Sequence, residues 1–202
     1  MTDRQFLWGL SNGGFALAMA GVFWLGFGFS QQLNQGGWTF PAVFTVMVYG
    51  TFAVIIWRAV LLRRRAGFKR SEFKQADDAQ RAEAHKIMVG FVAIVIAQTV
   101  LIAAAVPLCL HLDREDLVGP SIGLIVSLHF IPLGRIFHVR TYYFVGIVGS
   151  ALSLVAFFPW FGAGRLMFLG GTMGVLLWLS AVHMLWRADR ISSKALKERW
   201  SV

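Results

Sequence analysis

Six long apolar stretches occupy most of this chain and constrain its fold more than any other feature. They run over about 6–29, 38–62, 87–110, 120–137, 141–162 and 166–188. A helix needs about 20 apolar residues to cross the hydrocarbon core of a bilayer, and a backbone in lipid must satisfy its own hydrogen bonds. The sequence therefore predicts an all-α polytopic membrane protein, a bundle of six transmembrane helices in a single integral membrane domain over 1–202.

The overall composition supports a membrane as the solvent of this chain. Hydrophobic residues make up 57% of the sequence and charged residues only 14%, where soluble domains have about 45–50% and about 25%. A soluble domain of this size has too little interior to bury so much apolar surface. The single cysteine, Cys109, excludes an internal disulfide and any metal site built from several cysteines.

The charged residues predict the orientation of the spans. If the N-terminus is cytoplasmic, all but two of the 19 Lys and Arg residues lie on the cytoplasmic side, in the loop 63–86, the tail 189–202 and near the ends of the spans. The two exceptions are Arg114 and Arg165. Because cytoplasmic loops carry an excess of Lys and Arg, this pattern predicts that both termini are cytoplasmic. Within the loop, the helix-forming composition of 71–86 predicts a short helix that leads into the third span.

The net charge of +9 does not indicate binding to nucleic acid. The main cluster of basic residues directly follows the second span and consists of Arg63, Arg64, Arg65, Lys69 and Arg70. Basic clusters at this position set the topology and attract anionic lipid headgroups. Nucleic-acid recognition would require a folded basic surface with readout elements, which a chain of membrane spans does not offer. We therefore predict anionic lipid headgroups as a partner and no nucleic-acid partner.

Few polar side chains lie inside the predicted spans, and they are the candidate site residues. Asp, Glu and Lys are absent from the span interiors, which leaves histidines, amides, hydroxyls and one arginine, Arg135. Ionisable groups in hydrocarbon are costly and often functional. The fourth span is the richest, because His129 lies near the bilayer midplane and Pro132 removes a backbone donor close to it. His129 and Arg135 are therefore candidates for a substrate or ion pathway.

Other polar residues lie at a depth similar to that of His129. Gln98 in the third span and Tyr49 in the second could form a cluster with it, although hydrogen bonds between helices can also serve only to hold a bundle together. In the first span, Asn12 belongs to a polar Ser-Asn-Gly-Gly segment that resembles the unwound segments lining transporter sites. Asn12, Gln98 and Tyr49 complete the predicted pathway.

Glycine positions in the first and sixth spans predict close helix packing. Close helix packing through Gly14 is the alternative explanation of the Ser-Asn-Gly-Gly segment, since small residues let two helix backbones approach each other. Gly170 and Gly174 form a GxxxG pattern in the sixth span, for which a packing face is the simplest interpretation.

Two further histidines, His138 and His183, lie at the cytoplasmic edge of the fourth and sixth spans. Histidines at matched depth on different helices can ligate haem or a metal. Haem-binding bundles usually hold these ligands inside the span, so two histidines in contact with water and headgroups are the favoured interpretation. The sequence predicts no cofactor.

The fourth span also carries a recognisable motif. His129-Phe130-Ile131-Pro132 is followed by Arg135, and Tyr142-Tyr143 opens the next span. This arrangement resembles small bacterial multi-pass membrane proteins of unknown function, in which an HF-x-P motif in a middle helix precedes an aromatic pair. The resemblance implies a bacterial inner-membrane protein and implies no activity.

Three classes of function stay open at this point. The favoured one is a small transporter or channel-like protein with a polar site around the fourth helix. The alternative is a non-enzymatic scaffold or sensor subunit, with a homo-oligomer or another membrane protein as its partner. A haem-binding or lipid-modifying enzyme using Arg135 and the histidines is less favoured, because no rhomboid, phosphatase or Walker pattern is present.

Overall fold

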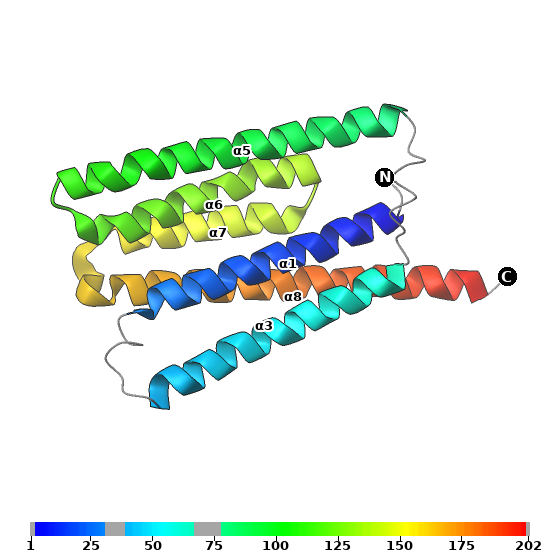
Figure 1. Cartoon of the computed structure of the whole chain (residues 1–202), viewed down its shortest axis with the longest axis horizontal. Helices are drawn as coiled ribbons and strands as arrows, with labels where there is room; N and C mark the ends of the chain where they lie inside the picture. Colours follow the sequence, from blue (N-terminus) through cyan, green and yellow to red (C-terminus); the bar gives the residue numbers. More distant parts are fainter. Residues whose placement is uncertain (1–2, 31–38, 67–77, 201–202) are drawn as a thin grey trace. The chain divides into compact units, whose positions relative to one another are not determined.

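The computed structural model describes residues 3–30, 39–66 and 78–200, and these residues form helices joined by short connections (Figure 1). The long helices are α1 (Asp3–Gly28), α3 (Thr39–Ala66), α5 (Asp78–His111), α6 (Val118–Phe137), α7 (Arg140–Ala156) and α8 (Arg165–Trp200). Two short 3₁₀ helices, η1 (Glu115–Leu117) and η2 (Pro159–Gly164), precede α6 and α8. No strand occurs in the described ranges, which confirms the predicted all-α class.

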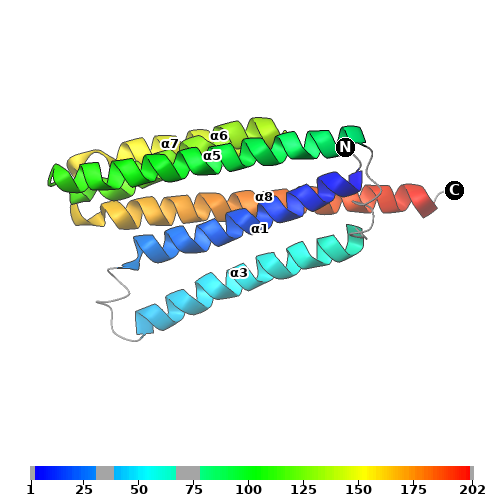
Figure 2. The ribbon, with the colours of Figure 1, turned by 45° about the horizontal axis from the view of Figure 1, so that its top comes forward.

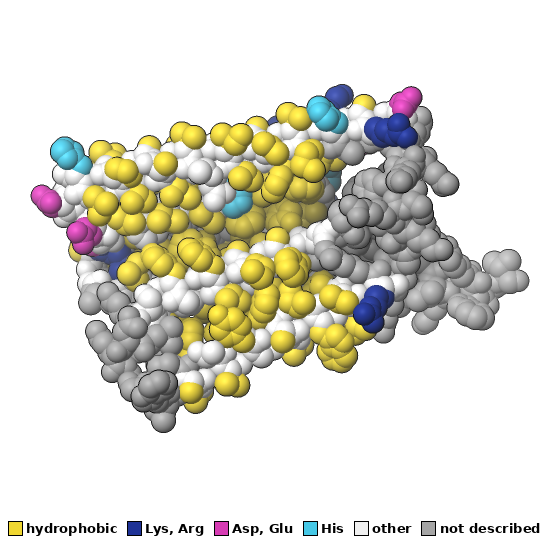
Figure 3. Space-filling view, viewed as in Figure 1, with side chains coloured by type: hydrophobic (Ala, Val, Ile, Leu, Met, Phe, Trp, Pro, Cys, Tyr) yellow, Lys and Arg dark blue, Asp and Glu magenta, His cyan; other side chains and the backbone are white. Residues whose placement is uncertain are grey.

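Within the described residues, four helices are long and apolar enough to cross a membrane: Ala42–Leu61, Arg81–His111, Glu115–Phe137 and Arg165–Ile191. On the face drawn in Figure 3, hydrophobic side chains cover the middle of α3 and α5, and charged side chains lie towards the helix ends. Asn12–Gly28 and Arg140–Ala156 are shorter apolar helices. Six spans therefore stay a prediction, as do the orientation of the termini and the inner membrane as the location.

The fifth apolar stretch ends earlier than its composition predicts. We expected a helix up to residue 162, but α7 ends at Ala156. Phe158 has an extended backbone, with φ −70° and ψ 143°, and Pro159 begins η2. The residue before a proline is pushed out of the helical region, because the proline ring would clash with its backbone. Pro159 therefore ends the helical path within the apolar run.

Three other helices are longer or more regular than the sequence suggested. The short helix predicted within 71–86 and the third span form one continuous helix, α5, which begins at Asp78. The sixth span continues through the predicted tail, because α8 ends only at Trp200. The unwound segment considered around Asn12 is wrong, since α1 is helical throughout Asp3–Gly28.

The chain divides into two compact units. The first comprises 1–26, 30–75 and 174–202, and the second comprises 27–29 and 76–173. In the first unit, α1 runs opposite to α3 and to its part of α8 (Figures 1 and 2). In the second, α6 runs opposite to its neighbours α5 and α7 (Figures 1 and 2).

In the first unit, α1 and α8 pack closely through small residues and one tryptophan. The Trp178 indole Nε1 donates a hydrogen bond to the Ala18 carbonyl over 3.2 Å. A Cβ on Gly21 would lie 3.2 Å from the Gly174 carbonyl oxygen and would collide with the Trp178 ring. Glycine at position 21 therefore makes room for the indole that joins the two helices.

In the second unit, α6 and α7 pack around two buried serines. The Ser153 hydroxyl donates to the Gly149 carbonyl one turn earlier, over 2.8 Å, and the Ser127 hydroxyl lies 3.9 Å from the Met173 sulfur. A Cβ on Gly146 would lie 2.7 Å from Ile131 Cγ1 and 3.1 Å from the Ser127 carbonyl oxygen. Small residues thus let the two backbones approach, as is usual where helices associate in lipid.

Candidate functional site

His129, the central residue of the predicted pathway, lies half-buried on α6 in the second unit. Its ring centroid is 4.3 Å from that of Phe130, and Phe130 in turn lies 5.8 Å from the Tyr142 ring. The His129 Nδ1 atom is buried and makes no hydrogen bond of normal length with a described residue. The imidazole therefore lies among aromatic rings.

The other predicted pathway residues lie on several helices. Arg135 is exposed near the end of α6, and Gln98 is half-buried on α5. Asn12 on α1 and Tyr49 on α3, the latter 59% exposed, belong to the first unit. The predicted cluster of His129, Gln98 and Tyr49 therefore spans both units and stays a prediction.

The two histidines considered as metal or haem ligands are both exposed, His138 at the end of α6 and His183 in the middle of α8. His138 follows α6 in a left-handed conformation, with φ 54°. The His183 ring lies 6.2 Å from the Trp186 ring on α8. Within the described ranges, no group of three or more His, Cys, Asp or Glu side chains lies close enough to hold a metal ion.

The three glycines predicted for helix packing each lie close to a residue of another helix. Gly14 faces Leu185, because a Cβ there would lie 3.1 Å from the leucine Cδ2, and Gly170 contacts the backbone of Gly28. A Cβ on Gly174 would lie 3.1 Å from the Gly21 carbonyl oxygen.

Among the residues predicted to bind lipid headgroups, Arg64 is an exposed residue of α3. Lys69 and Arg70, and the side chains of Arg63 and Arg65, lie outside the described residues.

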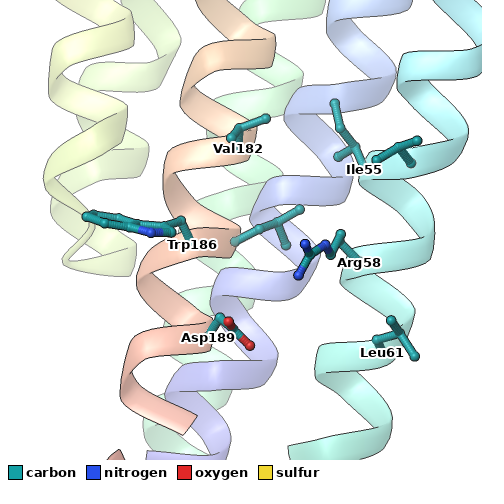
Figure 4. Close-up of a pocket in the computed structure, with 8 residues that line it drawn as sticks. Ile55, Arg58, Leu61, Val182, Trp186 and Asp189 are labelled. Carbon is teal, nitrogen blue, oxygen red and sulfur yellow. The ribbon is translucent and has the colours of Figure 1, made fainter. Parts of the chain in front are cut away.

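The first unit contains a pocket between α3 and α8, which we call the α3–α8 pocket (Figure 4). Its volume is about 250 Å³. Its apolar lining consists of Val54, Ile55 and Leu61 on α3 and Val182 and Leu185 on α8. Arg58, Trp186 and Asp189 complete the lining. The pocket thus combines an apolar wall with two residues of opposite charge.

The two charged residues of the pocket approach from different helices. Figure 4 shows the Arg58 side chain reaching from α3 towards α8, and the Asp189 carboxylate leaving α8 on the side that faces α3. Arg58 makes no hydrogen bond or ion pair with another residue in the described ranges. Asp189 is half-buried and has a partner of its own. Arg58 is therefore the charged group of this pocket that is available to a ligand.

The aromatic residue of the pocket carries a cation already. The Arg190 guanidinium carbon lies 3.6 Å from the centre of the Trp186 ring. A guanidinium over an indole face is attracted by the negative charge of the ring surface. This contact holds Arg190 beside the end of the pocket that contains Asp189.

Arg135 is not the one arginine within the predicted spans, which corrects the sequence-based prediction. Arg58 lies inside the second span, 38–62, and Arg187 lies at the end of the sixth, 166–188. Asp189 was missed for another reason, because it follows the predicted end of the sixth span by one residue. A residue-by-residue search of the apolar stretches for charge would have found Arg58, whereas its neighbourhood with Asp189 needs the packing of α3 against α8.

The second unit contains a buried arginine with three acceptors, which we call the Arg165 cluster. Arg165 begins α8 and is only 6% exposed. It forms a short ion pair with the Asp116 carboxylate and donates to the Asp116 carbonyl over 3.0 Å and to the Phe158 carbonyl over 3.4 Å. A cation is unfavourable at a helix N-terminus, and Asp116 offsets this cost. The cluster joins η1, the end of α7 and the start of α8.

The Asp116 carboxylate has a second, exposed partner. Arg114 Nε donates to it over 3.1 Å. This hydrogen bond, together with the charge of Asp116, raises the pKa of the Arg114 guanidinium above its usual value. The two arginines therefore share one carboxylate, one of them buried and the other on the surface.

The Arg165 cluster connects parts of the second unit, because the Nη1 and Nη2 atoms of Arg165 donate to acceptors of the protein itself. The α3–α8 pocket has the character of a ligand site, because Arg58 lies beside an apolar wall and pairs with no group in the part of the chain that the structure describes. A function must be argued from these residues, since no protein-family model, no curated protein and no solved structure matches this chain.

Proposed function

We propose that this protein is a small integral membrane carrier whose ligand site is the α3–α8 pocket. The observation that supports this proposal is Arg58, which lies inside the apolar segment Ala42–Leu61, lines an open space and has no partner among the described residues. A guanidinium beside an apolar pocket can bind an anionic group of a ligand while the apolar wall holds the remainder. The pocket supports transport at a different place from the α6 site that the sequence predicts.

We further propose that the pocket faces the cytoplasmic leaflet of a bacterial inner membrane, with both termini in the cytoplasm. Arg58 lies three residues before the end of its apolar segment, and the basic cluster from Arg63 to Arg70 follows directly in the sequence. Because basic loops stay in the cytoplasm, this end of α3 is expected at the cytoplasmic interface. The ligand would then enter from that side.

Labelling of a single cysteine tests the carrier. In a Cys109→Ser background, Val182→Cys in the pocket is expected to react with a membrane-impermeant methanethiosulfonate at least about tenfold faster than Leu179→Cys, because only a hydrated thiol ionises and reacts. Leu179 is a matched control, since it lies one turn earlier on α8, is 66% exposed and does not line the pocket. The rates are measured in inside-out vesicles.

Sidedness of the labelling separates a carrier from a closed site. A carrier exposes its ligand site to both sides in turn, so Val182→Cys is expected to react in right-side-out vesicles too, at a lower rate. Equal, slow labelling of both cysteines in both kinds of vesicle would contradict the proposal. Labelling from one side alone would show a binding pocket without transport.

A second candidate function is a non-enzymatic scaffold or partner subunit, and α5 favours it. None of the residues in the most apolar window of α5 is buried, although this helix has the highest hydropathy of the four. A subunit that recognises another helix through this face is expected to form disulfide-linked dimers as Val100→Cys in the Cys109→Ser background, since Val100 is 60% exposed. A monomer by light scattering that forms no crosslink would contradict this function.

A further inference from the structure

We propose that the α3–α8 pocket binds a phospholipid with a negatively charged headgroup, whose phosphate is held by Arg58. This inference rests on the proposed role of the pocket as the ligand site and names the class of ligand. The residues that carry it are Arg58 on α3 and the apolar wall that lies deeper along both helices.

The order of residues along the pocket matches the order of groups in a lipid. On α8, the charged residue Asp189 lies seven positions beyond Val182, which is about 10 Å along a helix. On α3, Arg58 lies one turn beyond Val54, in the same direction towards the charged helix ends. Leu61 lies about one turn beyond Arg58, but the other apolar residues of the lining lie on the side away from the charged helix ends, as the start of an acyl chain below a headgroup requires.

The size of the pocket indicates that it holds part of a lipid. Sites that enclose a drug-sized ligand measure about 300–1,000 Å³, and this pocket measures about 250 Å³. It lies between two helices that are both long and apolar enough to cross a membrane. A ligand that inserts its phosphate and the first part of its chain, and leaves the remainder in the bilayer, fits these dimensions.

Charge selects an anionic headgroup. A guanidinium presents a planar fork of N–H donors that matches two oxygens of a phosphate, and Arg58 has no partner among the described residues that would compete. Asp189, the other charged residue of the lining, has an interaction of its own, so Arg58 supplies the charge that acts on a headgroup. A zwitterionic lipid would bring an ammonium group close to this guanidinium and gain less.

Lipid titration monitored by native mass spectrometry tests this inference on the full chain in detergent. Phosphatidylglycerol is expected to bind at least about tenfold more tightly than phosphatidylcholine with the same acyl chains. Both lipids carry the phosphate, but Arg58 repels the choline ammonium of phosphatidylcholine. Arg58→Gln is expected to abolish most of this difference, and Arg58→Lys to keep part of it. Equal binding of the two lipids to the unchanged protein would overturn the inference.

The matched control is Arg140→Gln. Arg140 begins α7, is exposed, carries the same charge and does not line the pocket, and it lies outside the basic cluster, so its replacement is expected to change the affinity for phosphatidylglycerol by less than about twofold, as is usual for an exposed charge. Equal losses for Arg58→Gln and Arg140→Gln would show general attraction to positive charge and would overturn the inference. Arg58 is exposed, and its replacement is expected to leave the melting temperature within about 2 °C of the original.

A third measurement distinguishes a lipid from a free phosphate. Glycerol 3-phosphate at millimolar concentration is expected not to displace phosphatidylglycerol, because the apolar wall contributes only when an acyl chain is present. Displacement at concentrations similar to those of the lipid would identify a site for a soluble anion and would overturn the inference.

The outcome for the carrier is independent of the outcome for the lipid. Fast labelling of Val182→Cys from both sides together with lipid binding that ignores Arg58 would keep the carrier and reject the ligand class. Lipid binding that depends on Arg58 together with labelling from one side alone would keep the lipid site and reject transport.

Discussion

Replacing Arg165 by alanine is expected to lower the melting temperature of the detergent-purified protein by roughly 10 °C. Arg165 is buried and binds Asp116 and the Phe158 carbonyl, so its loss releases η1 and the end of α7 from the start of α8. Breaking a buried ion pair by removing one partner costs about 3 kcal/mol or more. The measurement is thermal unfolding followed by the helical circular-dichroism signal.

Variants around the same carboxylate separate the buried contact from simple surface charge. Arg114→Gln removes the exposed partner of Asp116 and is expected to shift the melting temperature by less than about 2 °C, because exposed ion pairs contribute little. Arg165→Lys keeps the charge but loses the fork of donors, so it is expected to lie between Arg165→Ala and the original protein. If Arg114→Gln and Arg165→Ala have equal effects, the Arg165 cluster does not stabilise this unit.

Gly28→Ala is expected to destabilise the protein by about 2–3 kcal/mol, which corresponds to roughly 5–10 °C in melting temperature. A Cβ at position 28 would lie 2.6 Å from the Gly170 Cα and 2.9 Å from the Leu166 carbonyl oxygen. Both atoms belong to the backbone of α8, so no side-chain rotation relieves the clash and the two helices must separate. Thermal unfolding in the same detergent gives the measurement.

Gly26→Ala is the matched control for this substitution. Gly26 lies two residues earlier on α1, and apart from its chain neighbours and the nearby backbone of its own helix, no described atom lies within 4 Å of the position that its Cβ would take. Because alanine is a better helix former than glycine, Gly26→Ala is expected to leave the melting temperature unchanged or to raise it slightly. Equal losses for both variants would mean that glycine serves a local need of α1 and that the contact between Gly28 and Gly170 is unimportant.

The sequence predicted the class of the fold and the course of most helices, because both follow from local hydropathy. The all-α class is confirmed, and the apolar stretches 38–62, 87–110, 120–137 and 166–188 each coincide with a helix of membrane length. The prediction was wrong where a local backbone rule opposed hydropathy, as at Pro159, which ends the fifth helical stretch.

The candidate site was predicted less well, because it depends on which faces of the helices meet. Depth along a span can be counted in the sequence, and it directed attention to His129. The sequence does not show how a helix is rotated about its axis relative to a helix beyond a loop. It therefore could not predict that Arg58 and Asp189 line the same pocket. Arg58 itself was visible as a charge inside an apolar stretch.

The sequence by itself determined that this chain forms apolar helices long enough to cross a membrane, and it placed Arg114 and Arg165 on the same predicted side. The tertiary structure alone decided which of these charges pair, that Arg165 is buried with Asp116, and that Arg58 faces a space between α3 and α8. The physical reason is that hydropathy acts on each segment separately. Pairing, by contrast, depends on contacts between side chains 49 residues apart, as between Asp116 and Arg165.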